Sequence, residues 1–175
     1  MKKAFLATAI FVFLSLLSPA LAIAKDAAAT FEDAFSPRQG ATELVVKTTE
    51  EAKKSIHVAA YSFTSRPIAS ALATAHDRGI DVEVVLDKSQ RHGWIVQYLK
   101  DHKIPSRLNY HYSIMHDKFF VVDEKTLELG SFNYTRAAER NNAENVLVIH
   151  SAGKLVKDYD KQWQKLWNEG EEAHD

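Results

Sequence analysis

The 175-residue sequence contains no cysteine, and this absence excludes two kinds of structural support. No disulfide bond can form, even in an oxidising compartment, and no zinc site can use thiolate ligands. Internal repeats are also missing. We therefore expect one domain that is stabilised by the packing of its core alone.

An excess of positive charge is missing too. The formal net charge is −1, and without residues 1–22 the chain keeps 20 basic and 23 acidic residues, a formal charge of −3. A protein that coats nucleic acid would carry a basic balance. The charge therefore argues against a DNA-packaging role, but it says little about an enzyme with a small cleft.

The N-terminus has the layout of a secretory signal peptide. Lys2 and Lys3 precede an almost wholly apolar run over residues 4–17, and Ala20-Leu21-Ala22 offers small residues for cleavage. The run is too short to span a bilayer comfortably, which disfavours an uncleaved anchor. We expect a signal peptide over 1–22, one domain over 23–175, a periplasmic or secreted location, and no stable membrane insertion after cleavage.

Strand and helix patterns alternate along the remaining chain. Apolar runs predict strands over 31–35, 56–63, 82–86, 116–122, 126–129 and 145–149. Helical spacing predicts helices over 42–54, around Ile68 to Ala75 with an end at Gly79, over 94–100 and over 152–168. The strand–helix–strand order over 56–86 indicates a parallel pair with a right-handed crossover. We predict an α/β fold: a mixed, largely parallel sheet with helices on both faces.

Two short segments carry side chains suited to phosphate chemistry. His116 and Lys118 point the same way on the predicted strand, about 7 Å apart. An imidazole beside an ammonium is costly in a core but suits a strand end that faces an anion. In Gly130-Ser131-Phe132-Asn133, the glycine permits a close backbone approach or a positive φ, while a hydroxyl and an amide can donate hydrogen bonds. Together these groups predict a phosphate-binding pocket.

Each segment alone is more often structural, but together they fit His-x-Lys-(x)4-Asp-(x)6-Gly-Ser-x-Asn from His116 to Asn133, with Asp123 as the aspartate. This pattern resembles the signature of the phospholipase D superfamily. The chain is small, carries one copy of the motif and has a predicted signal peptide. In these respects it is similar to the small exported bacterial EDTA-resistant endonucleases of that superfamily. The resemblance implies an α/β/α sandwich and a metal-independent phosphodiesterase that needs no cofactor.

The resemblance also implies individual roles. His116 attacks phosphorus and forms a phosphohistidine, Glu144 hydrogen-bonds the catalytic histidine, and Asp123 is more structural than chemical. Gly130 shapes the backbone that holds the site. The groups that bind the phosphoryl oxygens are Lys118, Ser131 and Asn133.

This chemistry requires two imidazoles, one neutral to attack and one protonated to release the leaving oxygen. The chain carries one motif, and no other histidine has a lysine two residues later. We therefore expect a C2 homodimer in which two copies of His116 share one active site.

The sequence leaves three functions open: a nonspecific endonuclease for DNA and probably RNA, a phospholipase D or cardiolipin-type hydrolase, and a non-catalytic nucleic-acid-binding module. A lipid hydrolase would need an apolar rim, and no exposed amphipathic segment is visible. Six basic residues in predicted loops or helix starts are candidates to line a groove for nucleic acid. They are Arg66, Lys88, Arg91, Arg107, Arg136 and Arg140.

Overall fold

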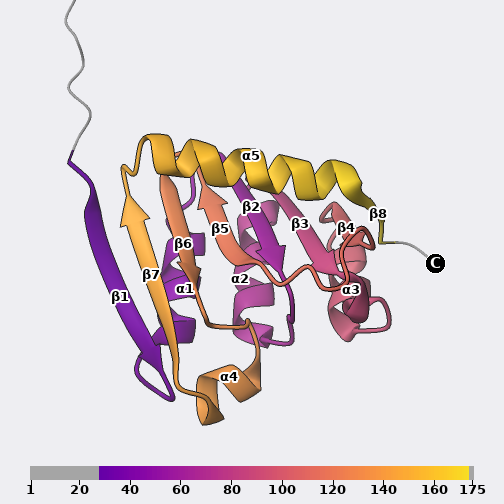
Figure 1. Ribbon diagram of the computed structural model, residues 1–175, viewed down its shortest axis with the longest axis horizontal. Helices are drawn as coiled ribbons and strands as arrows, with labels where there is room; N and C mark the ends of the chain where they lie inside the picture. The colour runs from indigo at the N-terminus through magenta and orange to yellow at the C-terminus, as the bar shows by residue number, and fades with distance from the viewer. Residues whose placement is uncertain (1–27, 174–175) are drawn as a thin grey trace, which may run out of the picture.

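The computed structural model describes residues 28–173, so the predicted signal peptide over 1–22 lies outside the described residues. In chain order the helices and strands are β1 (Thr30–Ser36), α1 (Ala41–Glu50), β2 (Ser55–Ala60), α2 (Arg66–Asp77), β3 (Asp81–Asp87), α3 (Trp94–Asp101), β4 (Ser106–Asn109), β5 (Lys118–Val122), β6 (Thr126–Gly130), α4 (Arg136–Asn141), β7 (Glu144–His150), α5 (Lys154–Glu169) and β8 (Gly170–Glu172). Figure 1 shows the strands side by side in one sheet, with α5 running along one end of it.

The sheet is mixed, as predicted, but it is mostly antiparallel rather than largely parallel. Its strand order is β1-β7-β6-β5-β2-β3-β4-β8. The pairs β2–β3 and β3–β4 are parallel, which confirms the predicted crossover, while the other five pairs are antiparallel. The physical reason is the short connection at 123–125, which can join β5 to β6 only as a hairpin.

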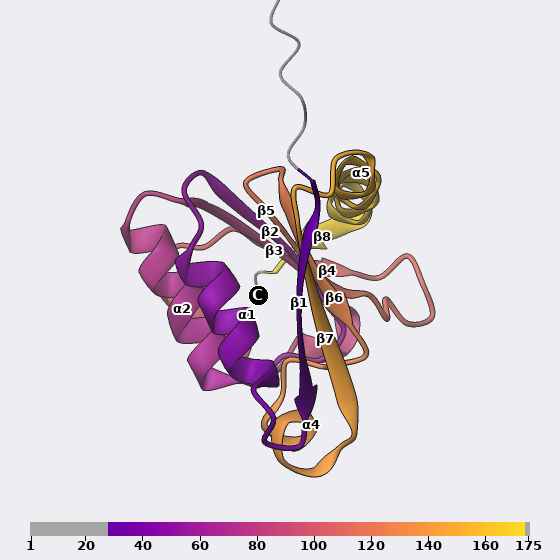
Figure 2. The ribbon, with the colours of Figure 1, turned by 90° about the vertical axis from the view of Figure 1, so that its left-hand side faces the viewer.

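Helices cover both faces of this sheet, as predicted. Figure 2 shows α1 and α2 on one side and α5 on the other. The side of α1 and α2 holds the larger core, to which α3 adds Ile95 and Leu99. On the other side, Trp163 of α5 is buried and donates an indole hydrogen bond to the Val58 carbonyl oxygen at 2.9 Å. Within residues 28–173, no helix combines the length and apolarity needed to cross a membrane.

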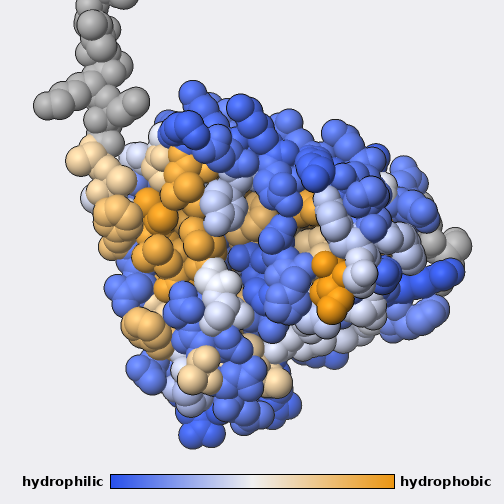
Figure 3. Space-filling model, viewed as in Figure 1, coloured by the Kyte–Doolittle hydropathy of each residue, from blue (hydrophilic) through white to orange (hydrophobic). Residues whose placement is uncertain are grey.

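An apolar surface remains open beside α5. Phe31 and Phe35 of β1 are 64% and 48% exposed, and the register aligns Phe31 with Ile149 on the face that α5 covers elsewhere. The half-buried Leu147 and Leu129 continue this surface over β7 and β6. Figure 3 shows a hydrophobic area there, over β1, β7 and β6. We call this exposed surface, made by Phe31, Phe35, Leu129 and Leu147, the outer sheet face; it is assembled from three strands, so no single amphipathic segment indicates it.

β5 is the strand that positions the motif. It lies between β2 and β6, and all four residues after Lys118 are buried. Lys118, at the beginning of β5, is therefore held at a fixed position where the strands end. β2 and β6 end at this same edge, because both run antiparallel to β5. Loops that follow β2 and β6 therefore meet the start of β5.

A buried carboxyl group fastens one of these loops. Glu128 of β6 is 1% exposed and accepts a hydrogen bond from the Tyr134 hydroxyl at 2.8 Å. Burial raises the pKa of Glu128 to about 8, although the bonds from Tyr134 and the Phe120 backbone oppose the shift. The Tyr134 carbonyl oxygen in turn accepts hydrogen bonds from the backbone N–H groups of Thr64 and Ser65, both at 2.8 Å. The segment over 131–134 is thus tied to the core and to the loop after β2.

Glu128 makes stability depend on pH. Its pKa is raised from 4.5 to about 8 on folding, so between these values the folded state binds more protons than the unfolded state. Its contribution is greatest below pH 4.5 and is lost as pH rises through 8, by up to about 1.4 kcal/mol per pH unit. Glu128→Gln keeps an acceptor for Tyr134 but cannot ionise. We expect chemical denaturation to show that the variant gains stability relative to wild type between pH 6 and pH 8.5; a constant difference over that range would contradict this role.

Candidate active site

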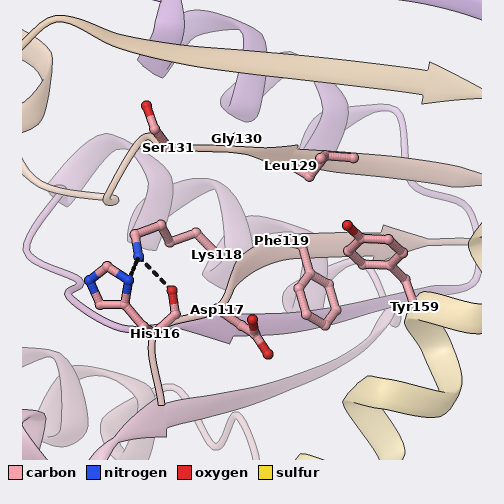
Figure 4. A pocket seen from close by; sticks show the side chains of 8 residues that line it. All are labelled: His116, Asp117, Lys118, Phe119, Leu129, Gly130, Ser131 and Tyr159. Carbon is pink, nitrogen blue, oxygen red and sulfur yellow. Dashed lines mark hydrogen bonds between the residues drawn. The ribbon is translucent and has the colours of Figure 1, made fainter. Parts of the chain in front are cut away.

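His116 and Lys118 meet at the edge of the sheet. His116 is exposed and lies two residues before β5, although the predicted strand began at residue 116, while Lys118 opens β5. The Lys118 ammonium lies 3.1 Å from His116 Nδ1 and donates to the His116 carbonyl oxygen at 2.5 Å. Figure 4 shows both contacts. Because an ammonium can only donate, Nδ1 is the acceptor in this contact.

Tyr61, which the sequence reasoning missed, supports this pair. It follows β2, its ring centroid lies 4.4 Å from that of His116, and Lys118 Nζ lies 5.3 Å from the centroid of the Tyr61 ring. The Tyr61 backbone N–H also donates to the Asp117 carbonyl at 3.1 Å. A signal was present, since Tyr61 lies near the carboxyl end of the first strand of the predicted parallel pair, and the carboxyl ends of such strands commonly carry sites.

Tyr61 should act by positioning His116. We expect Tyr61→Ala to lower kcat for phosphodiester hydrolysis roughly tenfold with a smaller change in KM, because the imidazole loses the ring that orients it. Tyr61→Phe keeps the ring and should restore kcat to within about threefold. Steady-state kinetics on both variants, with melting curves as a control, would test this. Equal losses of kcat in the two variants would point instead to the hydroxyl.

Ser131 and Glu144 come together from neighbouring strands. Ser131 Oγ donates to Glu144 Oε2 at 2.6 Å and accepts the Asn145 backbone N–H at 3.1 Å. The other carboxylate oxygen of Glu144 accepts from the Asn142 amide at 3.0 Å. Within the single chain, Glu144 therefore contacts Ser131 and Asn142, and the predicted bond to His116 is not formed.

Asn133 and Gly130 frame the same loop. The amide oxygen of Asn133 is buried and has no hydrogen-bond partner within the described residues. Such a group is costly unless a hydrogen-bond donor satisfies it, and Asn133 is not among the residues that line the pocket described below. Gly130 allows a close approach of backbones, since an added Cβ would lie 2.0 Å from the Asn145 carbonyl oxygen. Of the two explanations offered for this glycine, close approach is the one that applies.

Asp123 does not join this cluster. It follows β5 at the opposite edge of the sheet, about 17 Å along the strand from Lys118. Its carboxylate accepts backbone N–H bonds from Lys53, Lys54 and Ser55 at 2.7 to 3.1 Å. These bonds fasten the loop between α1 and β2 to the end of β5, so Asp123 serves the frame of the sheet and not the pocket.

The cluster opens into a pocket of about 360 Å³ on the side of the sheet that α5 covers. Partial burial lowers the pKa of Lys118, while the carboxylates of Asp117 and Glu144 oppose that shift. Within residues 28–173, no group of three or more acidic or histidine side chains is arranged to bind a metal ion. The pocket is lined by His116, Asp117, Lys118, Phe119, Leu129, Gly130, Ser131 and Tyr159.

Fold and motif together have the arrangement of the phospholipase D class, and sequence comparison agrees. Residues 45–167 match the family described as "Cardiolipin synthase, PLD-like domain", which spans more than half of the chain. The chain belongs to the phospholipase D superfamily.

Individual relatives of this chain carry different descriptions. The crystal structure of Nuc from Salmonella typhimurium, a phospholipase D family member, is 38% identical with a TM-score of 0.80, over 83% of this chain and 98% of that one. A phospholipase D from Rickettsia typhi is 35% identical over 74% of this chain and 64% of its own length. A mitochondrial cardiolipin hydrolase from Chlamydomonas reinhardtii is 31% identical over 67% of this chain and 53% of its own length. The chain thus spans somewhat less than two thirds of these two curated relatives.

Proposed function

We propose that the protein is a nonspecific endonuclease that hydrolyses DNA, and also RNA, without a metal ion and through a covalent phosphohistidine at His116. The observation that carries this proposal is the meeting of an exposed imidazole, an ammonium and a serine hydroxyl in one open pocket. A nucleic-acid substrate is supported by the resemblance of the motif and chain size to the small exported bacterial endonucleases, and the chain accounts for 98% of the short protein Nuc.

The unliganded geometry suggests how the nucleophile is prepared. Lys118 holds His116 Nδ1, which leaves the ring proton on Nε2. When Lys118 donates instead to a phosphoryl oxygen of the substrate, Nδ1 no longer has to accept a hydrogen bond. The ring proton can then reside on Nδ1, which leaves the lone pair of Nε2 free to attack. Substrate binding and activation of the imidazole are then coupled through Lys118.

The reaction proceeds in two displacements. Nε2 attacks phosphorus, an N–P bond forms, and the P–O bond to the leaving group breaks while a second imidazolium protonates the departing oxygen. That second imidazole then takes a proton from water, whose oxygen attacks phosphorus and breaks the N–P bond. Charge on the phosphoryl oxygens is stabilised by Lys118, Ser131 and Asn133.

The second imidazole comes, in this proposal, from a second copy of the chain. No histidine besides His116 lines the pocket within the described residues. The outer sheet face offers a docking surface, because its Leu129 also lines the pocket and its Phe31 and Phe35 are largely exposed. A C2 homodimer that covers this face would bring Glu144 within reach of His116 of the partner subunit. The mechanism requires a proton on Nδ1, and the Glu144 carboxylate would accept a hydrogen bond from that Nδ1–H group.

A phospholipid hydrolase is the second candidate, since the outer sheet face would also suit acyl chains bordering the pocket. The test uses the protein lacking residues 1–22 in EDTA, with plasmid DNA, a single-stranded RNA and vesicles containing cardiolipin or phosphatidylcholine. We expect cleavage of both nucleic acids. Hydrolysis of lipid alone would favour the second candidate, and binding of DNA without cleavage would favour a non-catalytic module.

We also propose that the enzyme acts in the periplasm or outside the cell. Mass spectrometry of the protein recovered from a bacterial periplasm should give an N-terminus near residue 23. An intact Met1 in that fraction would contradict cleavage of the signal peptide.

A further inference from the structure

Three of the six basic residues singled out in the sequence gather in a second cavity. It has a volume of about 460 Å³ and lies between the start of α1, the loop before α2, and α4. Arg66, Arg136 and Arg140 line it together with Thr42, Thr64 and Ser65, among others. We call this cavity the arginine pocket.

The other basic candidates are already engaged or lie elsewhere. Lys88 donates to the Tyr112 carbonyl at 2.8 Å. Arg107 donates to the Trp167 carbonyl at 2.8 Å and stacks on that ring. Arg91 is exposed and does not line the arginine pocket. Of the six basic candidates, only Arg66, Arg136 and Arg140 therefore line the same pocket.

The arginine pocket keeps an excess of positive charge, because its three guanidinium groups face two carboxylates, those of Glu43 and Glu139. No salt bridge within residues 28–173 involves Arg66, Arg136 or Arg140. Glu139 also lines the pocket, but one of its oxygens is held by the backbone N–H and hydroxyl of Thr42, at 3.0 and 2.5 Å. A concave site with three guanidinium groups and neighbouring hydroxyls suits an oxyanion such as phosphate.

Arg66 is also oriented before any ligand arrives. Its guanidinium carbon lies 4.8 Å from the centroid of the Trp94 ring, a cation–π contact that holds the side chain. A guanidinium held in this way loses less freedom when it binds an anion. The contact therefore favours a binding role over that of a freely moving surface charge.

One loop links the two pockets, since it runs from Ser131, which lines the catalytic pocket, to Arg136, which lines the arginine pocket. Arg136 follows Asn133 by three residues, a span of about 10 Å at most. The Thr64 and Ser65 N–H groups bond the Tyr134 carbonyl, so both rims are fixed to one loop. A polyanion with its scissile phosphate at His116 continues beyond the catalytic pocket and has further phosphates to place in the arginine pocket, whereas a small diester with one phosphate has none.

We propose that the arginine pocket is a second phosphate subsite, which binds a phosphate flanking the scissile one in a nucleic-acid strand. This inference rests on the proposed function and deepens it. The subsite would make the enzyme select polymeric phosphodiesters over small ones, through charge and not through base identity.

The test compares two substrates in the variant Arg66→Gln/Arg136→Gln/Arg140→Gln. One is a single-stranded oligonucleotide, and the other is bis(p-nitrophenyl) phosphate, which has one phosphate. We expect the ratio of kcat/KM for the oligonucleotide to that for the small diester to fall at least about tenfold. The slope of log kcat/KM against log salt for the oligonucleotide should become shallower by about 0.7 for each phosphate that the variant no longer binds.

A matched control removes three exposed lysines elsewhere, Lys53→Gln/Lys100→Gln/Lys157→Gln, and should leave the ratio within about twofold of wild type. An equal loss on both substrates would overturn the subsite, as would an unchanged ratio.

Failure of the proposed function itself would look different, since the wild-type protein would then cleave neither substrate. In that case, fluorescence anisotropy of the same oligonucleotide still tests the arginine pocket. Weaker binding by the arginine variant than by the lysine variant would support it, and equal binding would overturn it.

Discussion

Replacing His116 by alanine should reduce phosphodiester hydrolysis on the order of 10³-fold or more, the largest loss expected from any single side chain here. The residue is exposed and its ring lies against Tyr61 and Lys118 at the surface, so its removal should leave the fold intact. The measurement is kcat on plasmid DNA in EDTA, with circular dichroism as the check on folding. DNA cleavage that persists in the folded variant would refute the assignment of the nucleophile.

The same variant tests whether two chains share one site. Equal amounts of wild type and His116→Ala are unfolded together and refolded, so that about a quarter of the dimers carry two copies of His116. If both imidazoles are required, activity per total chain should be about a quarter of that of refolded wild type. Activity near one half would mean that each chain works alone, and the homodimer proposal would fail.

Sequence reasoning located the motif well, because its evidence is local. The prediction put His116 and Lys118 side by side, and their atoms meet, although His116 lies before β5 and not on a strand. The spacing also placed Ser131 beside the same pocket. Tyr61 was missed because it reaches the imidazole from the end of β2, about fifty residues earlier, and no local pattern reports such a contact.

Strand direction and surface shape were harder to predict, because both depend on pairing between distant segments. β1 and β7 lie next to each other although more than a hundred residues separate them. The outer sheet face is invisible along the chain, since Phe31, Leu129 and Leu147 come from three different strands. β4 and β8 are too short for a periodic pattern, and they form only because each finds a partner at the end of the sheet.

The contact between Glu144 and Ser131 also lies beyond single-chain sequence reasoning. The resemblance implied a bond between this carboxylate and the catalytic histidine, whereas in the single chain Glu144 is held by Ser131 and Asn142. If the proposed dimer is correct, the expected bond is made across the interface. One residue would then have two successive partners, a hydroxyl in the monomer and an imidazole in the assembly.

Gly130→Ala is expected to destabilise the protein by at least about 2 kcal/mol and to reduce activity along with stability. A Cβ at this position would lie 2.0 Å from the carbonyl oxygen and 2.9 Å from the carbonyl carbon of Asn145. Both are backbone atoms of β7, so the clash cannot be relieved by turning a side chain. β6 and β7 would have to separate, and the bond from the Asn145 N–H to Ser131 Oγ would lengthen.

Gly153→Ala supplies the matched control for this prediction. Gly153 has a φ of +50°, and a Cβ added there would lie more than 4 Å from every neighbouring atom of the described residues. Alanine at this position therefore meets backbone strain but no clash, a cost of about 1–3 kcal/mol because φ +50° with ψ −114° is a conformation that only glycine adopts readily. Urea denaturation should show a loss of stability in both variants, whereas kcat measured well below both melting temperatures should fall only in Gly130→Ala. Equal kcat in the two variants would mean that β6 and β7 tolerate the extra carbon, and that Gly130 is not required for the position of Ser131.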